Sequence, residues 1–212
     1  MTKQERAVRT RAAFIRAAAE LFDVNGYHIT SLAQVCRRAG LSSGAMMFHF
    51  PSKQELADSV EAEGRSRLAA ALGSREEAAT GPPLQSVVRL SVAFAELVET
   101  DCAVRASLAL ARDRGHCDPL SDLWLPVIGE QIGQASAQGH LPGGVSEDDV
   151  RALAEHLTRG AVACRTAHLV AGHTRQDTAT DVLAQLWKAV LPALSAPAAP
   201  LARAGEEHPL PS

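Results

Sequence analysis

Hydrophobic positions recur with helical spacing along almost the whole chain. Apolar residues repeat at i, i+3, i+4 and i+7, whereas the alternation of apolar and polar residues that marks a strand is rare. In the first segment, for example, Phe14, Ala17, Ala18, Leu21 and Phe22 fall on one face of a helix. The pattern therefore predicts an all-α protein.

Residues that cap helices divide this pattern into about nine segments. Ser, Thr or Asp stands where a helix would begin, often with Gln or Glu three residues later, and Gly stands where one would end. Asp118 and Thr174 are the expected caps of the seventh and ninth helices, and Pro126 is expected to kink the seventh. Pro and Ala dominate 195–212, so we expect a disordered tail there. The predicted helices cover about 5–24, 32–39, the residues after Ser42, 53–72, 84–99, 102–112, 119–139, 147–171 and 175–194.

The composition is typical of a soluble globular protein. The chain has 212 residues, of which 46% are hydrophobic and 21% are charged. No apolar stretch approaches the roughly 20 residues that cross a bilayer, and the basic first residues are not followed by the apolar segment of a secretory signal. Cys36, Cys102, Cys117 and Cys164 are far apart, which favours buried apolar roles over disulfides. We therefore expect a cytoplasmic protein that does not enter a membrane.

Charge is divided unevenly along the chain. Residues 1–53 hold eight Lys or Arg against three Asp or Glu, a net charge of +5, and the remaining residues carry -8. A basic segment on an acidic body suits a protein that binds a polyanion, because only the contacting face has to neutralise phosphates. A solvated face without a partner would give the same count, so charge alone leaves both interpretations open.

The basic segment also contains two short helices joined by a tight turn. Gly40 ends the first, Leu41 forms the connection, and Ser42 can cap the second. Such a helix-turn-helix lets one helix enter the major groove of DNA while its neighbour contacts the backbone. Small residues at the start of the second helix can approach bases or phosphates, and a His and a Lys follow where they could hold phosphate. The candidate DNA-binding residues are Gln34, Arg37, Ser42, Ser43, Gly44, Met47, His49 and Lys53.

This segment resembles the DNA-binding domain of the TetR family of transcriptional repressors. The resemblance implies a homodimer that binds double-stranded operator DNA with its second and third helices and a small hydrophobic inducer in its C-terminal domain. It also implies a helix-turn-helix domain over 1–52, a ligand-binding and dimerisation domain over 53–194, and a tail over 195–212. The residues that carry it are 14–22, Gly26-Tyr27, Ser31-Leu32, Val35, 39–42, 44–50, Lys53 and Leu56.

Two positions depart from the family pattern. Ser42-Ser43 stands where the family usually has Thr-Lys, and Met47 stands where it usually has Tyr. A lost Lys removes a contact to phosphate or guanine, and a lost Tyr hydroxyl removes a hydrogen bond to phosphate. We therefore expect an altered operator affinity or an altered choice of operator.

A narrower resemblance points to the γ-butyrolactone receptors within this family. It rests on the His49-Phe50 pair before Lys53, on residues 84–90, and on Trp124. Trp124 is either the wall of a ligand pocket or an ordinary packing residue, and the resemblance favours the pocket. Apolar neighbours and a few polar groups would complete such a cavity. The candidate ligand-binding residues are Phe94, Leu108, Trp124, Val127, Ile128, Gln131, Val162 and Thr166.

The last predicted helix has a wider apolar stripe than one core face requires. The stripe either lies deep inside one subunit or forms a dimer interface with the preceding helix, and we favour the interface. Dimerisation would supply the two-fold symmetry that a palindromic operator mirrors. The candidate interface residues are Leu183, Leu186, Trp187, Val190 and Leu194.

Other classes of function lack their usual residues. Cys164 and His168 are one helical turn apart, but a closed zinc site needs four ligands and a second pair at such spacing is missing. The chain has no nucleophile elbow, Gly-rich phosphate loop or zinc-protease motif, so we expect no catalytic residues, metal or cofactor. The favoured function is a ligand-responsive repressor. The alternatives are a small helical enzyme or carrier of a hydrophobic ligand, and a pseudo-receptor that responds to an antibiotic or to no lactone.

Overall fold

The structure is a computed structural model that describes the backbone of residues 2–77, 81–116, 120–171 and 178–195. Side chains are described for the same residues except 74–77, 164–171 and 195. Within these ranges the regular structure is helical throughout, which confirms the all-α prediction. The helices are α1 (Lys3–Ile29), α2 (Leu32–Ala39), α3 (Ser43–His49), α4 (Lys53–Glu77), α5 (Pro83–Thr100), α6 (Cys102–Arg114), α7 (Ser121–Ala137), α8 (Glu147–Ala171) and α9 (Ala179–Ser195).

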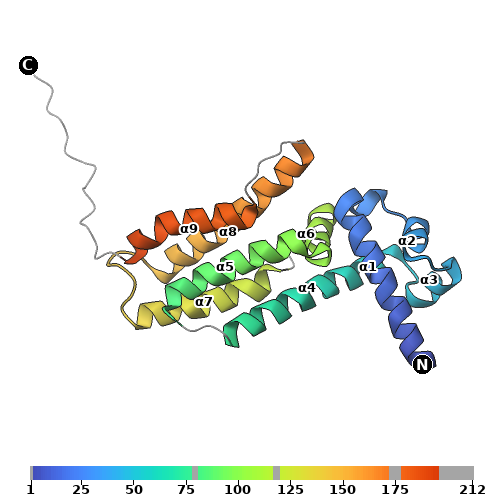
Figure 1. The fold of residues 1–212 in the computed structure, drawn as a ribbon, viewed down its shortest axis with the longest axis horizontal. Helices are drawn as coiled ribbons and strands as arrows, with labels where there is room; N and C mark the ends of the chain where they lie inside the picture. Colours follow the sequence, from blue (N-terminus) through green and yellow to red (C-terminus); the bar gives the residue numbers. More distant parts are fainter. Residues whose placement is uncertain (1, 78–80, 117–119, 172–177, 196–212) are drawn as a thin grey trace, which may run out of the picture.

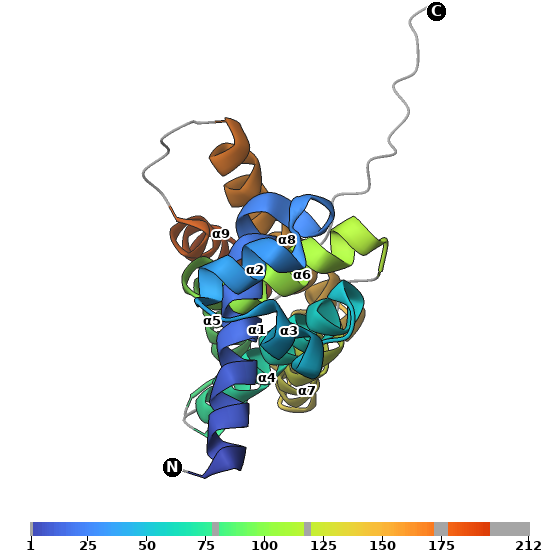
Figure 2. The same cartoon turned by 90° about the vertical axis from the view of Figure 1, so that its right-hand side faces the viewer.

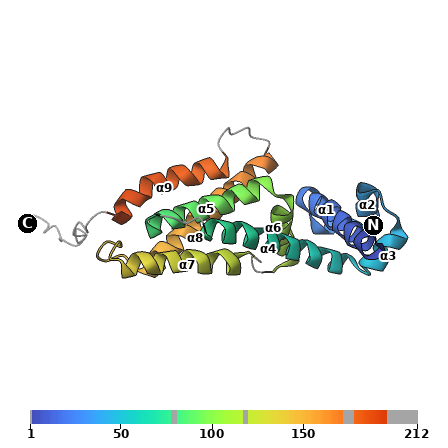
Figure 3. The same cartoon turned by 60° about the horizontal axis from the view of Figure 1, so that its bottom comes forward.

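The molecule is elongated, and its two ends are built from different helices (Figures 1 and 3). α1, α2 and α3 form one end, whereas α5, α7, α8 and α9 form the body at the other. The long helix α4 runs between them, and α6 lies at the junction against α1 and α4. Figure 2 shows the α1–α3 end face-on, with the N-terminus of α1 extending past α3.

α1 begins earlier and ends later than the pattern predicts. Thr2 caps it, because the Thr2 hydroxyl accepts a hydrogen bond from the Glu5 N–H (3.2 Å) and the Glu5 carboxylate accepts one from the Thr2 N–H (2.9 Å). At the other end Gly26 has a φ of 76° and a ψ of 172°, which interrupts the helical backbone. Gly26 is thus the break that the sequence indicates, and residues 27–29 continue as helix beyond it.

Local hydrogen bonds determine where the last two helices begin. α8 begins where the sequence predicts, since Ser146 and Asp149 cap each other's backbone N–H groups (3.1 and 2.9 Å). α9 begins after Thr178, which forms the same arrangement with Asp181. The N-cap of the described α9 is therefore Thr178, four residues beyond the expected Thr174.

Some predicted features fall outside the described residues. These are the expected caps Asp118 and Thr174 and the expected tail, apart from the backbone of residue 195.

α7 remains helical through Pro126, from Ser121 to Ala137. In the part of the chain that the structure describes, no helix combines the length and the apolarity that a bilayer-crossing segment needs.

Two clusters of buried apolar side chains form the interior. α4 and α6 contribute to both clusters, with Val60 and Leu110 in the first and Leu68 and Val104 in the second. These two helices therefore connect the regions that the sequence divides at residue 52. The first cluster, the N-terminal core, includes Phe14, Phe22, Val35, Met46, Phe50, Leu56 and Leu110. The second, the body core, includes Leu72, Leu84, Phe94, Trp124, Ile128, Leu183 and Trp187.

Candidate functional site

α2 and α3 form a helix-turn-helix whose ends are fixed by small polar residues. Ser31 caps α2 together with Gln34, whose side-chain oxygen accepts the Ser31 N–H at 2.6 Å. Gly40 ends α2 in the left-handed conformation (φ 67°, ψ 30°), which glycine adopts without steric cost. Ser42 caps α3 by accepting a hydrogen bond from the Ala45 N–H at 3.2 Å. Gln34 and Ser42, both candidate DNA-binding residues, thus also hold the backbone of this unit.

α3 has an inner and an outer face. Met46 and the C-cap residue Phe50 are each 1% exposed and pack in the N-terminal core. Phe48, by contrast, is 80% exposed. The sequence reasoning did not propose it as a DNA-binding residue, because spacing alone does not distinguish an outward Phe from an inward one. The outer face consists of Ser43, Gly44, Met47 and Phe48.

Two candidate phosphate-binding residues contact aromatic rings of the N-terminal core. The Lys53 ammonium lies 4.3 Å from the centre of the Tyr27 ring and donates a hydrogen bond to the His28 carbonyl at 3.4 Å. Burial lowers the pKa of Lys53. A phosphate contact by Lys53 would therefore compete with this cation–π contact. His49 is half-buried, and its ring lies against the rings of Phe14, Phe48 and Phe50.

The α1–α3 end carries several exposed basic side chains. Not every arginine of this end is available for DNA, since Arg38 forms an ion pair with Glu20 (2.6 Å). The first turns of α1, which extend past α3 in Figure 2, were not among the candidate DNA contacts. The exposed basic residues of this end include Lys3, Arg6, Arg9, Arg16 and Arg37.

Trp124 lies in the body core, stacked on Phe94. The ring centroids are 5.1 Å apart, the planes are inclined by 19°, and Trp124 is 1% exposed. Ile128 is buried in the same core. Gln131, two helical turns after Trp124 on α7, is a buried polar residue. The side chain of Thr166 lies outside the described residues. The other candidate ligand-binding residues pack against this core; they are Leu108, Val127 and Val162.

Two buried hydrogen-bond donors in the body lack a partner. Among the described side chains, the indole N–H groups of Trp124 and Trp187 are buried and accepted by no oxygen or nitrogen atom. An unpaired buried donor costs about 1–3 kcal/mol. A molecule with acceptor oxygens that entered this core could satisfy such donors.

The apolar stripe of α9 is turned inward more than the sequence analysis expects. Leu183, Trp187 and Leu194 are buried inside a single subunit, because this side of α9 packs on α5 and α8. Leu186 is 38% exposed and Val190 is half-buried. Of the five candidate interface residues, these last two are the ones that reach the surface of the subunit.

A surface pocket of about 540 Å³ lies where α7 meets α8. Arg151 lies beside Gly129 there, with two guanidinium nitrogens at an ordinary contact distance of 3.6 Å from where a Cβ at this glycine would stand. Trp124 does not line this pocket, and no sequence pattern indicated it. Its lining residues are Ser121, Asp122, Leu125, Pro126, Gly129 and Arg151.

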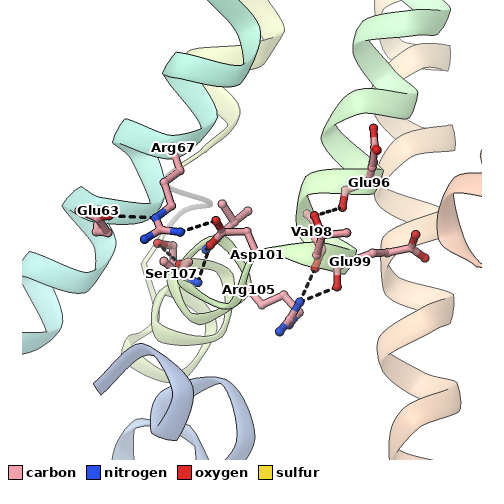
Figure 4. A network of polar contacts seen from close by, with 11 residues as sticks. Glu63, Arg67, Glu96, Val98, Glu99, Asp101, Arg105 and Ser107 are labelled. Atoms are coloured by element: carbon pink, nitrogen blue, oxygen red, sulfur yellow. Dashed lines mark hydrogen bonds and ion pairs between the residues drawn. The ribbon is translucent and has the colours of Figure 1, made fainter. Parts of the chain in front are cut away.

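α6 is tied to α4 by an ion-pair network at its N-terminus (Figure 4). Asp101 accepts hydrogen bonds from the N–H groups of Ala103 (2.8 Å) and Val104 (3.3 Å) and from Arg67 of α4 (2.7 Å). Arg67 also donates to Glu63 at 2.9 Å. Burial raises the pKa of Asp101, but the Arg67 guanidinium and the two N–H groups outweigh burial and bring this pKa below its ordinary value.

Arg105 connects α6 to the N-terminal end and to the body, and Figure 4 shows its contacts to the body. Its guanidinium binds Asp23 of α1 at 2.8 Å and donates to the carbonyls of Val98 (3.1 Å) and Glu99 (2.7 Å) at the end of α5. The Glu99 carboxylate accepts a hydrogen bond from the N–H of Ala179, the first residue of α9. Polar contacts thus run without interruption from α1 to α9.

α4 and α6 touch at Gly64. A Cβ at this position would lie 2.0 Å from the Ser107 hydroxyl oxygen and 2.7 Å from the Ala103 carbonyl oxygen, so glycine is required for so close an approach. Gly64 also separates Val60, which lies in the N-terminal core, from Leu68, which lies in the body core. The contact is therefore placed where a tilt of α4 would move one core relative to the other.

Within the described side chains, His, Cys, Asp and Glu do not gather in groups of three that could hold a metal ion. The side chains of Cys164 and His168, which are one helical turn apart in the sequence, are not among the described ones. The same holds for Cys117 and His173.

Residues 14–60 match the family model described as bacterial regulatory proteins, tetR family. This range contains α2, α3, most of α1 and the start of α4. The chain is therefore a DNA-binding transcription regulator of the TetR family, with a helical C-terminal region. Because this family is not enzymatic, the alternative of an enzyme is set aside.

Over most of its length the chain is also similar to γ-butyrolactone receptors. It is 28% identical to the A-factor receptor protein of Streptomyces griseus over 200 residues, which are 93% of this chain and 68% of that protein. A crystal structure of a gamma-butyrolactone receptor, an ArpA-like protein, has a TM-score of 0.70 and 28% identity over 90% of both chains. CprB from Streptomyces coelicolor, in complex with its biological operator sequence, has a TM-score of 0.68 and 28% identity over 90% of both chains. The narrower resemblance is thereby confirmed.

Proposed function

We propose that the protein is a repressor that leaves its operator when a small lipophilic molecule binds in the body core. A γ-butyrolactone or an antibiotic-like compound is the proposed ligand, and genes of secondary metabolism are the proposed targets. The observation that carries the proposal is Trp124, which is buried and stacked on Phe94, and whose indole N–H has no partner among the described residues. Relatives that are named as receptors of A-factor and of γ-butyrolactones support this class of ligand.

The chemistry of a lactone matches that of the body core. Its carbonyl oxygen would accept the Trp124 N–H, which removes the cost of an unpaired donor. Its apolar part would contact Phe94, Ile128 and Val162. Gln131 and Thr166 are the proposed additional polar contacts. A pure hydrocarbon of the same size would leave the indole donor unpaired and bind more weakly.

Release of DNA requires that the ligand bind the two states of the protein unequally. α6 carries Leu108, a proposed ligand contact, and also the residues that bind α1 and α4, namely Arg105 and Asp101. A ligand that displaces α6 would therefore tilt α4 about the contact at Gly64. The proposed result is a changed position of α3.

The proposed active form is a homodimer. The outer sides of α8 and α9, including Leu186 and Val190, are the proposed interface, and they belong to the proposed ligand-binding and dimerisation domain over 53–194. Two copies of the proposed DNA-binding domain over 1–52 would place their α3 helices in successive major grooves, about 34–36 Å apart. Residues 195–212 remain the proposed tail.

A release assay tests this proposal. The full chain is bound to a labelled duplex taken from the DNA beside its own gene, and fluorescence anisotropy follows the complex while a lipophilic lactone is added. The native protein should release the duplex. Trp124→Ala should bind DNA but resist release, because the indole supplies much of the buried contact. Trp124→Phe keeps an aromatic ring, so its ligand affinity should fall by about 5- to 150-fold through the lost hydrogen bond.

Circular dichroism of each variant provides the control for folding, because truncation of a buried Trp costs about 3–5 kcal/mol of stability. If a folded Trp124→Ala variant releases DNA at the native ligand concentration, Trp124 is a packing residue and the ligand site is wrong. If an antibiotic releases the native protein and no lactone does, the chain is a pseudo-receptor.

A further inference from the structure

The outer face of α3 is apolar where a recognition helix meets the bases of DNA. Phe48 is 80% exposed and Met47 is 54% exposed. Both side chains share a face with Ser43 and Gly44, opposite the buried Met46. Large exposed hydrophobic side chains are uncommon in the described part of the chain, and this seven-residue helix carries two of them. Such exposure is costly unless a partner covers the face.

The composition of α3 limits which bases it can distinguish. Bidentate contacts to guanine require Arg or Lys, and those to adenine require Asn or Gln, but α3 (SGAMMFH) has none of these residues. The side-chain oxygen of Gln34 on α2 is already used to cap that helix. The feature of a base edge that an apolar side chain can contact is the 5-methyl group of thymine.

We propose that Met47 and Phe48 recognise thymine 5-methyl groups in the major groove of the operator. This inference rests on the proposed function, because it assigns the base contacts of the same DNA-binding surface. Phosphates form no favourable contact with these side chains, since a hydrocarbon surface or a thioether offers no donor to a phosphate oxygen. Exposed basic residues of the α1–α3 end, among them Arg6 and Arg37, would supply the phosphate contacts that hold α3 in the groove.

The size of the effect follows from the burial of one methyl group. Covering a methyl against an apolar side chain corresponds to about a fourfold gain in affinity. The affinity for a site with several contacted thymines would therefore depend strongly on their methyl groups. Deoxyuridine lacks this methyl group but presents the same hydrogen-bonding edge.

Replacement of thymidine by deoxyuridine tests the proposal directly. The duplex is the tightest binder that the full chain selects from a random-sequence DNA library, and each thymidine is replaced singly. The native protein should lose about fourfold in affinity at each contacted position. Phe48→Ala and Met47→Ala should bind the thymidine duplex more weakly and no longer distinguish thymidine from deoxyuridine at their own positions. Val24→Ala, which shortens a side chain that is 81% exposed on α1, is the matched control and should retain the native discrimination.

Each outcome decides the matter. Equal affinity of the native protein for every deoxyuridine duplex overturns the inference, as does an equal loss by Phe48→Ala on thymidine and deoxyuridine duplexes. Operator release by a lactone together with equal affinity for deoxyuridine overturns only this inference. Failure of the native protein to select any duplex overturns both this inference and the proposed function.

Discussion

The two ends of the molecule use aromatic residues in opposite ways. Five of the eight aromatic residues lie in the α1–α3 end and three in the body. In the α1–α3 end, Phe14, Phe50 and His49 pack ring against ring. In the body, Trp124 and Trp187 are buried, and neither indole donor has a partner among the described residues. The N-terminal core is therefore filled by its own rings together with residues of α4 and α6, whereas the body core holds two polar donors among apolar side chains.

This difference fits the proposed function, in which one end binds the rigid surface of DNA and the other binds a small molecule. The caps of α2 and α3 at Ser31 and Ser42 fix the orientation of the helix-turn-helix before DNA arrives. In the body, an added acceptor would remove the cost of an indole donor that the described part of the chain leaves unpaired. The proposed coupling between the ends would depend on α4 and α6, which contribute to both cores.

Added salt should weaken DNA binding at the α1–α3 end far more than ligand binding in the body, and this is the largest expected difference between the two ends. A protein that contacts six to ten phosphates loses about 10³- to 10⁵-fold in DNA affinity between about 50 and 200 mM salt, because bound counterions are released. A neutral ligand in an apolar core releases none, so its affinity should change by less than about twofold. Anisotropy measures DNA binding and Trp fluorescence measures ligand binding in the same buffers. A flat salt response of DNA binding would contradict the assignment of the basic end.

Dimerisation is the proposed route by which the body strengthens DNA binding. Leu186→Glu places a charge on the outer side of α9 and should give monomers that bind the operator about 10²- to 10⁴-fold more weakly, because the two half-sites are no longer linked. Gln138→Glu adds the same charge at an exposed position after α7 and should remain dimeric. Sedimentation measures the mass of both. A native protein that sediments as a monomer would show that the interface is wrong.

The contact between α4 and α6 should be sensitive to a single methyl group. Gly64→Ala should destabilise the fold by about 1–3 kcal/mol, because a Cβ there meets the Ala103 carbonyl and the Ser107 hydroxyl. Gly73→Ala is the matched control in the same helix, where a Cβ meets nothing within 4 Å, and it should stabilise by about 0.5–1 kcal/mol. Urea unfolding compares the two. Equal stabilisation by both substitutions would mean that the helices do not approach as described.

The stability that Asp101 contributes at the junction of α4 and α6 should depend on pH. Its pKa is below the ordinary value of about 3.9, so the stability it contributes is fully present above that value and is lost as pH falls through the lower folded pKa. Asp101→Asn keeps an acceptor for the α6 cap but removes the charge that binds Arg67. The stability difference between native protein and variant should thus be largest near neutral pH and shrink below about pH 4. A difference that is constant with pH in thermal unfolding would refute this role.

The sequence predicted best those features that depend on neighbouring residues. The cap at Ser42, the end of α2 at Gly40 and the start of α8 at residue 147 follow from local hydrogen bonds and backbone freedom, and the structure has all of them. The resemblance of the basic segment to one family rests on the same kind of local pattern. The resemblance was therefore confirmed both for the family and for its γ-butyrolactone receptor branch.

Features that depend on distant residues could not be predicted. The spacing of α9 gives a wide stripe but does not say that Trp187 faces inward while Leu186 faces outward, because that choice depends on α5 and α8. The link from Asp23 to Arg105 joins residues 82 positions apart. The exposure of Phe48 likewise depends on how α3 packs on the N-terminal core.

The central claim, that the two ends form coupled sites, is tested most directly by measuring ligand and operator binding to the same protein in both orders. Linkage requires that a saturating ligand weaken the operator by the same factor by which saturating operator weakens the ligand. Anisotropy of the duplex and fluorescence of Trp124 in a Trp187→Phe background report the two affinities. The account predicts equal factors of at least about fivefold. Ligand binding that is unchanged by operator would contradict it.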